Sequence, residues 1–198
     1  MSKYNISIVS EKHPEHLKPT WRGNKNVRAA VHPSGDPEYP KIFAEHFSEF
    51  SGSILEVGAG DGFLAHHILS TYPDVEYTIL DIKFNIETVL KKRLEEFPNV
   101  TFVNSADYEE VFKNTYDLFI ETHCLSETPR YYYTRLLENL SAKSCLVIDY
   151  AGDPNDPGFE ETLENWFKQY TSGEKHTNMN LAGAKKMGGI PVYIGKKE

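Results

Sequence analysis

The chain has 198 residues, a net charge of −8, and 39% hydrophobic and 13% aromatic residues. That length suits one domain with a real core, and the hydrophobic content excludes a disordered chain. No stretch approaches the roughly 18–20 apolar residues of a membrane span, and the N-terminus carries no secretory signal. The acidic balance argues against a nucleic-acid binder, which usually needs a clustered basic face.

The chain contains two cysteines, Cys124 and Cys145. Neither has a nearby Cys or His at metal-ligand spacing, which argues against a disulfide scaffold and against a zinc domain. We therefore expect a cytoplasmic protein.

The first 35 residues carry scattered prolines, glycines and histidines and little periodicity beyond a short strand expected near residues 6–9. The sequence therefore predicts an irregular N-terminal arm or lid over residues 1–35, followed by one domain over residues 36–198. A basic, aromatic-bearing piece around Trp21 and Arg22 fits either a lid over a site or a flexible arm.

From residue 36 onward, helices and strands alternate. In chain order the pattern predicts a helix after Asp36-Pro37, strand 53–57, helix 62–71, strand 75–80, helix 84–97, strand 100–103, helix 108–113, strand 116–120, helix 129–140, strand 145–149, helix 158–170, and strands 177–181 and 192–194. This order predicts a three-layer, doubly wound α/β fold. Its mostly parallel sheet of about seven strands has helices on both faces, and a ligand site beyond the carboxyl ends of the strands.

The first strand of this alternation leads into an acid followed by three glycines at alternate positions, Glu56, Gly58, Gly60 and Gly62. Glycines let the backbone turn sharply and approach a ligand closely, and the next helix offers its N-terminal amides there. A dinucleotide fingerprint would place its third glycine at Phe63 instead. The motif resembles the glycine loop of the class I, Rossmann-like S-adenosylmethionine-dependent methyltransferases.

This resemblance implies S-adenosylmethionine as the cofactor and assigns roles to seven residues. Glu56 and the turn of Gly58, Gly60 and Gly62 would hold the methionine end. Asp81, at the tip of the second strand, would accept hydrogen bonds from the ribose hydroxyls. Ile82 would pack on the adenine, and Asp107 would receive the adenine amino group. Asp81 and Asp107 could instead be caps of the helices that follow them.

The segment after residue 116 lies where the donor methyl meets the acceptor. It lacks the motif of amino-methylating nucleic-acid enzymes and is most similar to the sugar O-methyltransferases, whose pattern runs Phe-Ile-Asn-Thr-x-Ser-x-x-Glu-Met. The positions that match it are Phe119, Ile120, Thr122 and Glu127; those that depart from it are Glu121, Cys124 and Thr128.

A hydroxyl acceptor gains from a base that removes its proton, and the candidates here are His123, Glu121 and Glu127. His123 is preferred because an imidazole titrates close to neutral pH; it could instead only hydrogen-bond the loop, and Glu127 could cap the next helix. Asp149, with Asp153 and Asp156, fits a divalent-cation site or an ordinary solvated loop. The loop is favoured, so no metal is expected.

The sequence thus predicts a methyltransferase that uses S-adenosylmethionine and methylates a hydroxyl of a small polar acceptor, such as a sugar-containing metabolite. A methyltransferase of RNA or protein, and a non-catalytic methyltransferase-like partner subunit, remain as alternatives. Homodimerisation is one way for so small a chain to complete its acceptor pocket. No membrane partner is expected, and nucleic acid is disfavoured as a partner.

Overall fold

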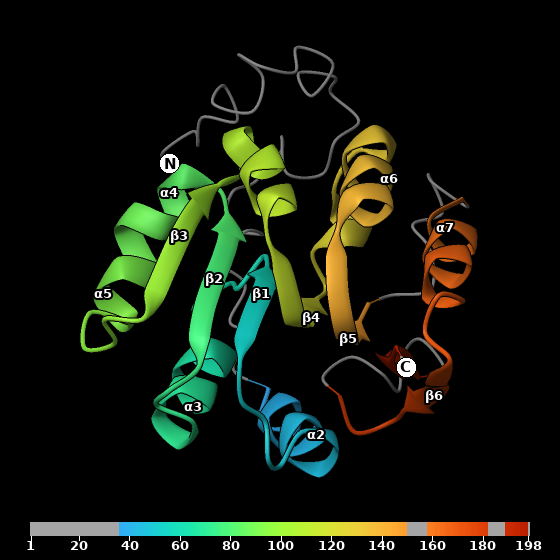
Figure 1. Ribbon diagram of the computed structural model, residues 1–198, viewed down its shortest axis with the longest axis horizontal. Coiled ribbons are helices and arrows are strands. Elements are labelled where there is room, and N and C mark those ends of the chain that lie inside the picture. The colour runs from blue at the N-terminus through green and yellow to red at the C-terminus, as the bar shows by residue number, and fades with distance from the viewer. Residues whose placement is uncertain (1–35, 150–157, 182–188, 198) are drawn as a thin grey trace.

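The computed structural model describes residues 36–149, 158–181 and 189–197. Their strands form one seven-stranded sheet in the order β3-β2-β1-β4-β5-β7-β6, which runs from left to right in Figure 1. The strands are β1 (Ser53–Val57), β2 (Glu76–Asp81), β3 (Val100–Asn104), β4 (Thr115–Thr122), β5 (Ser141–Ile148), β6 (Ser172–Asn178) and β7 (Ile190–Lys196). The first five are parallel, and β7 runs antiparallel to both β5 and β6. This confirms the predicted mostly parallel, doubly wound fold.

The helices cover both faces of the sheet. On one face lie α2 (Glu38–His46), α3 (Phe63–Thr71) and a continuous helix made of α4 (Lys83–Asn85), η3 (Ile86–Leu90) and α5 (Lys91–Arg93). On the other face lie η4 (Ser105–Lys113), α6 (Arg130–Asn139) and α7 (Gly158–Phe167). Since side chains alternate along a strand, each central strand feeds both core clusters: Leu118 and Ile120 point to the first and Phe119 to the second.

Most predicted elements are present, and three of them differ from the prediction by four residues or more at one end. The helix predicted over 84–97 ends at Arg93, because Leu94 leaves helical geometry and is only 2% exposed. Strand β5 begins at Ser141, ahead of the predicted 145. Strand β6 covers Ser172–Asn178 instead of 177–181, because nearly all of it is exposed and polar and so gives no apolar alternation to read. The strand expected near residues 6–9 lies outside the described residues.

The aromatic residues of the late helix are packing residues. Phe159 is 1% exposed and Tyr170 5% exposed, and Trp166 and Phe167 pack against the same core cluster. These four side chains therefore pack α7 and the turn after it against the sheet.

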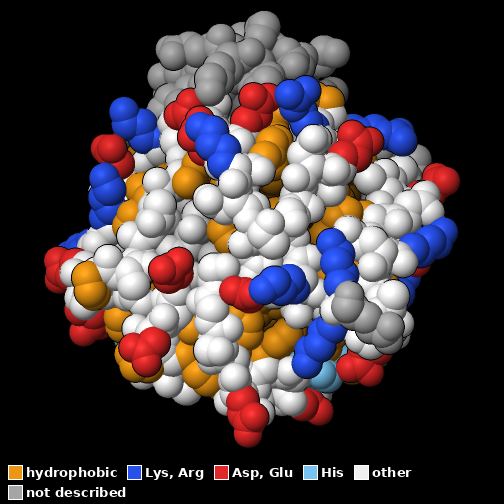
Figure 2. All heavy atoms as spheres, viewed as in Figure 1, with side chains coloured by type: hydrophobic (Ala, Val, Ile, Leu, Met, Phe, Trp, Pro, Cys, Tyr) orange, Lys and Arg blue, Asp and Glu red, His pale blue; other side chains and the backbone are white. Residues whose placement is uncertain are grey.

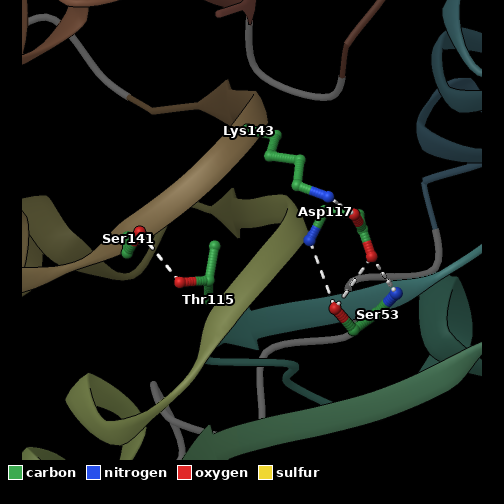
Figure 3. A network of polar contacts seen from close by, with 5 residues as sticks. All are labelled: Ser53, Thr115, Asp117, Ser141 and Lys143. Atoms are coloured by element: carbon green, nitrogen blue, oxygen red, sulfur yellow. Dashed lines mark hydrogen bonds and ion pairs between the residues drawn. The ribbon is translucent and has the colours of Figure 1, made fainter.

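A polar network joins neighbouring strands at the N-terminal end of the parallel sheet, opposite the end where the glycine turn follows β1 (Figure 3). The Asp117 carboxylate accepts hydrogen bonds from the Ser53 backbone N–H at 2.8 Å and from the Ser53 hydroxyl at 3.0 Å. Lys143 Nζ lies 2.7 Å from the same carboxylate. These contacts join β1, β4 and β5 near their N-terminal ends, so the two ends of the sheet have separate roles.

In the described part of the chain, none of the helices has the length and apolar character needed to span a membrane. Cys124 and Cys145 are both free thiols.

Candidate active site

The turn after β1 takes a shape that requires glycine. Gly58, Gly60 and Gly62 have φ angles of 70°, 57° and 76°, a region that disfavours side chains. The Gly58 N–H also donates to Leu80 O at 2.9 Å, which ties the turn to β2. A Cβ on Gly58 would lie 2.3 Å from Cys124 Sγ. The loop after β4, which contains Cys124 and is called the acceptor-side loop below, is therefore packed directly against the glycine turn.

Glu56 lies at the end of β1, 1% exposed. Its Oε2 accepts a hydrogen bond from the Tyr77 hydroxyl at 2.9 Å. Burial raises the pKa of Glu56 to about 8, although the Tyr77 hydrogen bond opposes that rise. A buried carboxyl of this kind favours a ligand that brings a positive charge or hydrogen-bond donors.

Asp81 ends β2, and both of its carboxylate oxygens have partners. Oδ1 accepts from the Ile82 N–H at 2.7 Å, and Oδ2 accepts from Asn85 Nδ2 at 2.8 Å. Burial raises the pKa of Asp81 to about 7, with these hydrogen bonds opposing the rise. The N-cap residue of the following helix is Ile82, so the cap alternative for Asp81 is not adopted.

Asn85 links Asp81 to the glycine turn. Its Nδ2 also donates to Gly60 O at 2.7 Å, while its Oδ1 is buried without a hydrogen-bond partner among the described residues. An orphaned buried acceptor costs free energy unless a ligand supplies a donor. This atom therefore points to a bound molecule with donor groups beside Asp81.

The two remaining predicted cofactor residues, Ile82 and Asp107, are half-buried. Asp107 follows β3 with non-helical angles of φ −113° and ψ 26°. Asn104 caps the first turn of that helical segment, and its Oδ1 accepts from the Ala106 N–H at 3.2 Å. Asp107 lies at a kink between two helical turns, so a cap role for the second turn stays a prediction. Adenine contacts for both residues stay predictions.

On the acceptor side, Glu121 in β4 is fully buried and holds the loop that follows it. Its Oε1 accepts from the Cys124 N–H at 2.5 Å and from the Leu125 N–H at 2.9 Å. Burial and the nearby Asp149 raise its pKa well above the usual value. Because Glu121 is buried and its Oε1 is occupied by two backbone N–H groups, it is poorly placed to accept a proton from a substrate, and His123 is the better candidate base.

His123 follows β4 directly, in a strained conformation. Its φ of 57° is the one positive φ at a non-glycine residue among the described residues, and its N–H donates to Ile148 O at 2.8 Å. The side chain is 17% exposed, with Nδ1 4.0 Å from Asp149 Oδ1. Strained residues that the surroundings fix in place concentrate at active sites.

Asp149 and Glu127 complete this region. Asp149, 1% exposed, accepts from the Ser126 N–H at 2.9 Å and from the Ser126 hydroxyl at 2.5 Å. It is therefore not part of a solvated loop. Glu127 lies in η5 (Leu125–Glu127), and the N-cap of α6 is Pro129, so Glu127 is not that cap.

No metal site is apparent where the chain is described: its His, Cys, Asp and Glu side chains do not meet in groups of three that could bind an ion. Asp153 and Asp156, named as alternative metal ligands, lie outside the described residues, as do Trp21 and Arg22 of the predicted arm.

Comparison with known proteins agrees with this geometry. Residues 39–125 match the family model of the methyltransferase small domain. A malonyl-(acyl-carrier protein) O-methyltransferase of Anoxybacillus flavithermus (strain DSM 21510 / WK1) is 29% identical over 144 residues, which cover 72% of this chain and 49% of that protein. An O-methyltransferase family protein from Burkholderia thailandensis superposes with a TM-score of 0.58 at 10% identity, covering 81% of this chain and 55% of that one.

The fold is that of the class I S-adenosylmethionine-dependent methyltransferases.

A third methyltransferase, the glycopeptide N-methyltransferase MtfA complexed with sinefungin, has a TM-score of 0.58 at 13% identity, covering 80% of this chain and 85% of that one. The chain spans about half the length of the curated relative and of the Burkholderia protein. The methyltransferase signature implies S-adenosylmethionine as cofactor. The buried carboxyls, the glycine turn and the orphaned Asn85 oxygen fit such a molecule, which carries a sulfonium, an ammonium and ribose hydroxyls.

Several residues of this candidate site are not predicted from the sequence. Tyr77 in β2 donates to Glu56 in β1, and Asn85 in α4 donates to Asp81 at the end of β2. Asn85 had a signal, because it lies four residues after Asp81 at a helix start, which places the two on one face. Ser126 had none, since its partner Asp149 lies just after β5, 23 residues away.

Proposed function

We propose that this methyltransferase transfers the methyl group of S-adenosylmethionine to a hydroxyl oxygen of a small polar acceptor, such as a sugar-containing metabolite. One observation carries the proposal: the glycine turn and the loop after β4 are in direct contact. Cys124 packs against Gly58, and His123 immediately precedes Cys124 in the chain. A donor on the turn and an acceptor at His123 would therefore be neighbours, and positioning supplies much of the rate of such a displacement.

The cofactor would supply an electrophilic methyl group on a positively charged sulfur. Glu56 and the glycine turn would hold its methionine end, with Asp81 on the ribose hydroxyls and Asp107 and Ile82 at the adenine. His123 would accept the proton of the acceptor hydroxyl as the oxygen–carbon bond forms. The similarity of the β4 loop to sugar O-methyltransferases supports a hydroxyl acceptor, with Glu121, Cys124 and Thr128 as departures from that pattern.

A second candidate acceptor is the acyl group of a carrier protein, which the 29% identity to a malonyl-(acyl-carrier protein) O-methyltransferase favours. The carboxyls of Glu127 and Asp149 lie near Cys124 in the loop after β4 and would disfavour an anionic acceptor such as a malonyl carboxylate. We therefore prefer an uncharged hydroxyl.

A nucleic-acid acceptor has less support. On the face shown in Figure 2, Lys and Arg side chains are interspersed with Asp and Glu instead of forming a continuous basic patch. Together with the net charge of −8, this speaks against RNA, because phosphate binding depends on clustered positive charge.

The test has two steps. Calorimetric titration with S-adenosylmethionine, S-adenosylhomocysteine and NAD should show binding of the first two only. Formation of S-adenosylhomocysteine is then measured with four acceptor pools: neutral sugars and nucleotide sugars, malonyl-carrier protein, RNA and protein. Turnover with the first pool supports the proposal, and turnover only with another pool replaces the acceptor class. Absence of cofactor binding overturns the proposal, and tight binding without turnover on any pool supports the non-catalytic alternative.

A further inference from the structure

Asp149 is buried at the tip of β5 and contacts two parts of the acceptor loop. Its Oδ2 accepts from the Ser126 backbone N–H at 2.9 Å, and its Oδ1 accepts from the Ser126 hydroxyl at 2.5 Å. The same Oδ1 lies 4.0 Å from His123 Nδ1. One carboxylate therefore fixes the C-terminal part of the loop and faces the imidazole at its start.

The backbone directs His123 toward this carboxylate. The residue holds a φ of 57°, a conformation that costs about 1–3 kcal/mol outside glycine. The His123 N–H is bonded to Ile148 O, the residue before Asp149. Nδ1 is buried while the side chain keeps 17% exposure, so the exposed part of the ring lies away from Asp149.

Glu121 is a second buried carboxyl whose pKa responds to Asp149. Burial first, and then the charge of Asp149, raise the pKa of Glu121 well above its usual value. The raised pKa favours the neutral form of Glu121, and the Ser126 N–H and hydroxyl would stabilise a negative charge on Asp149.

We propose that Asp149 is the positioning residue for His123: it keeps the proton of the neutral imidazole on Nδ1 and leaves the lone pair of Nε2 directed toward the acceptor. This inference rests on the proposed function, in which His123 is the base. The distance of 4.0 Å between Nδ1 and Oδ1 is longer than a hydrogen bond, and contacts of this kind often shorten in the complex with substrate. The tautomer of a histidine is set by the partner of its second nitrogen.

The substitution Asp149→Asn tests this directly. The Ser126 N–H is a fixed donor, so the new amide must turn its oxygen toward it and its NH2 toward His123 Nδ1. An NH2 group there favours a proton on Nε2, the wrong tautomer for a base. We expect kcat to fall about 10²-fold, with the acceptor KM and the cofactor Kd changed by less than about threefold.

A double-mutant cycle separates positioning from general damage. If Asp149 acts through His123, the variant His123→Gln/Asp149→Asn should have the same kcat as His123→Gln alone. Losses that multiply would overturn the inference. Asp117→Asn is the matched control, an Asp-to-Asn change at the opposite end of the sheet, and should leave kcat unchanged.

A second readout does not depend on activity. The ¹⁵N shifts of the His123 ring, assigned with His123→Gln, should report a proton on Nδ1 in the unaltered protein and on Nε2 in Asp149→Asn. A proton on Nε2 in the unaltered protein overturns the inference even if the variant does not fold. If no acceptor is turned over, the proposed function fails, while this measurement still decides the role of Asp149.

Discussion

At the scale of single residues, the cofactor side of the site is defined by two carboxyls that burial leaves partly protonated near neutral pH. Glu56 has a pKa of about 8 and Asp81 of about 7. Tyr77 and Asn85 orient them. Each carboxyl is thus positioned before any ligand arrives but gains most of its electrostatic stabilisation from the ligand.

Replacing Glu56 with Gln should weaken S-adenosylmethionine binding about 10- to 100-fold, the cost of one charge-assisted interaction of about 1.5–3 kcal/mol. The fold should persist, because the new amide oxygen can still accept from the Tyr77 hydroxyl. Calorimetry gives the affinity. Tyr77→Phe is the companion variant and should lose less, since the carboxylate remains; equal affinity in Glu56→Gln and the unaltered protein would remove Glu56 from the site.

Cofactor binding should release protons. Below pH 7 both carboxyls are largely protonated in the free protein, and a cationic, donor-rich ligand favours their ionised forms. Affinity should therefore rise from pH 6 to about pH 7.5, below the pH at which an α-amino group of pKa about 7.7–8.0 loses its charge. At pH 7 the calorimetric heat should differ between phosphate and Tris buffers, and Glu56→Gln should reduce the difference. Identical heats would show that no proton is released.

The order of the candidate cofactor residues along the chain is what predicts them from the sequence, and their binding role stays a prediction. Glu56, Gly58, Gly62 and Asp81 each lie at the tip of a strand or in the turn that follows it. The acceptor-side clamp of Asp149 and Ser126 was not predicted, because it depends on the register of β4 against β5. A single sequence contains no direct signal for such cross-strand contacts.

At the scale of elements, the glycine turn is where the cofactor side of the candidate site packs against its acceptor side. Gly58 has Cys124 Sγ 2.3 Å from the position of a Cβ, whereas Gly62 has Leu90 Cδ2 at 3.0 Å. Both have a positive φ. The two positions therefore share backbone strain and differ in steric overlap.

The variant Gly58→Ala should lose about 2–4 kcal/mol of stability, from positive-φ strain plus overlap. Gly62→Ala should lose only about 1–2 kcal/mol, since it pays the strain and the flexible end of Leu90 can move. Chemical denaturation measures both. Equal losses would mean that the contact with Cys124 adds nothing to the requirement for glycine at position 58.

Element prediction succeeded where apolar runs and breakers coincide. Strand β1 matched its prediction, and α3 begins one residue late at Phe63, after the last glycine. The helix predicted over 84–97 was too long, because Pro98 suggested its end, whereas Leu94 turns into the core and stops the helix four residues earlier. The π-helical segment Ile86–Leu90 has no breaker or periodicity that would have revealed it.

At the scale of the whole molecule, the two ends of the parallel strands differ: a polar network joins the strands at one end (the fastened end), and the candidate site lies at the other. The contacts of Asp117 with Ser53 and Lys143 fasten three strands at one end. The glycine turn and the loop of His123 lie at the other. Changes at the fastened end should alter stability without altering the chemistry.

The substitution Asp117→Ala should destabilise the fold by about 1–3 kcal/mol and leave cofactor affinity unchanged. The Lys143 and Ser53 hydrogen bonds lower the pKa of Asp117, so its contribution is present above the unfolded pKa of about 3.9 and is lost as pH falls through the lower folded value. Melting curves of the two proteins should therefore converge in acid. Thr115→Val, at the exposed Thr115–Ser141 contact of the same edge, is the control and should change stability by about 0.5 kcal/mol at most.

Strand β7 lies between β5 and β6 and alternates between the two faces: Val192 and Ile194 enter one core, and Tyr193 the other. Inserting a single amino acid inside this strand would invert the orientation of every side chain beyond it, sending aliphatic groups where an aromatic ring belongs. Two insertions would restore the alternation. The fold should thus tolerate even-numbered insertions in β7 better than odd-numbered ones. The same should hold for the pairing of β6, because β7 is its neighbour in the sheet.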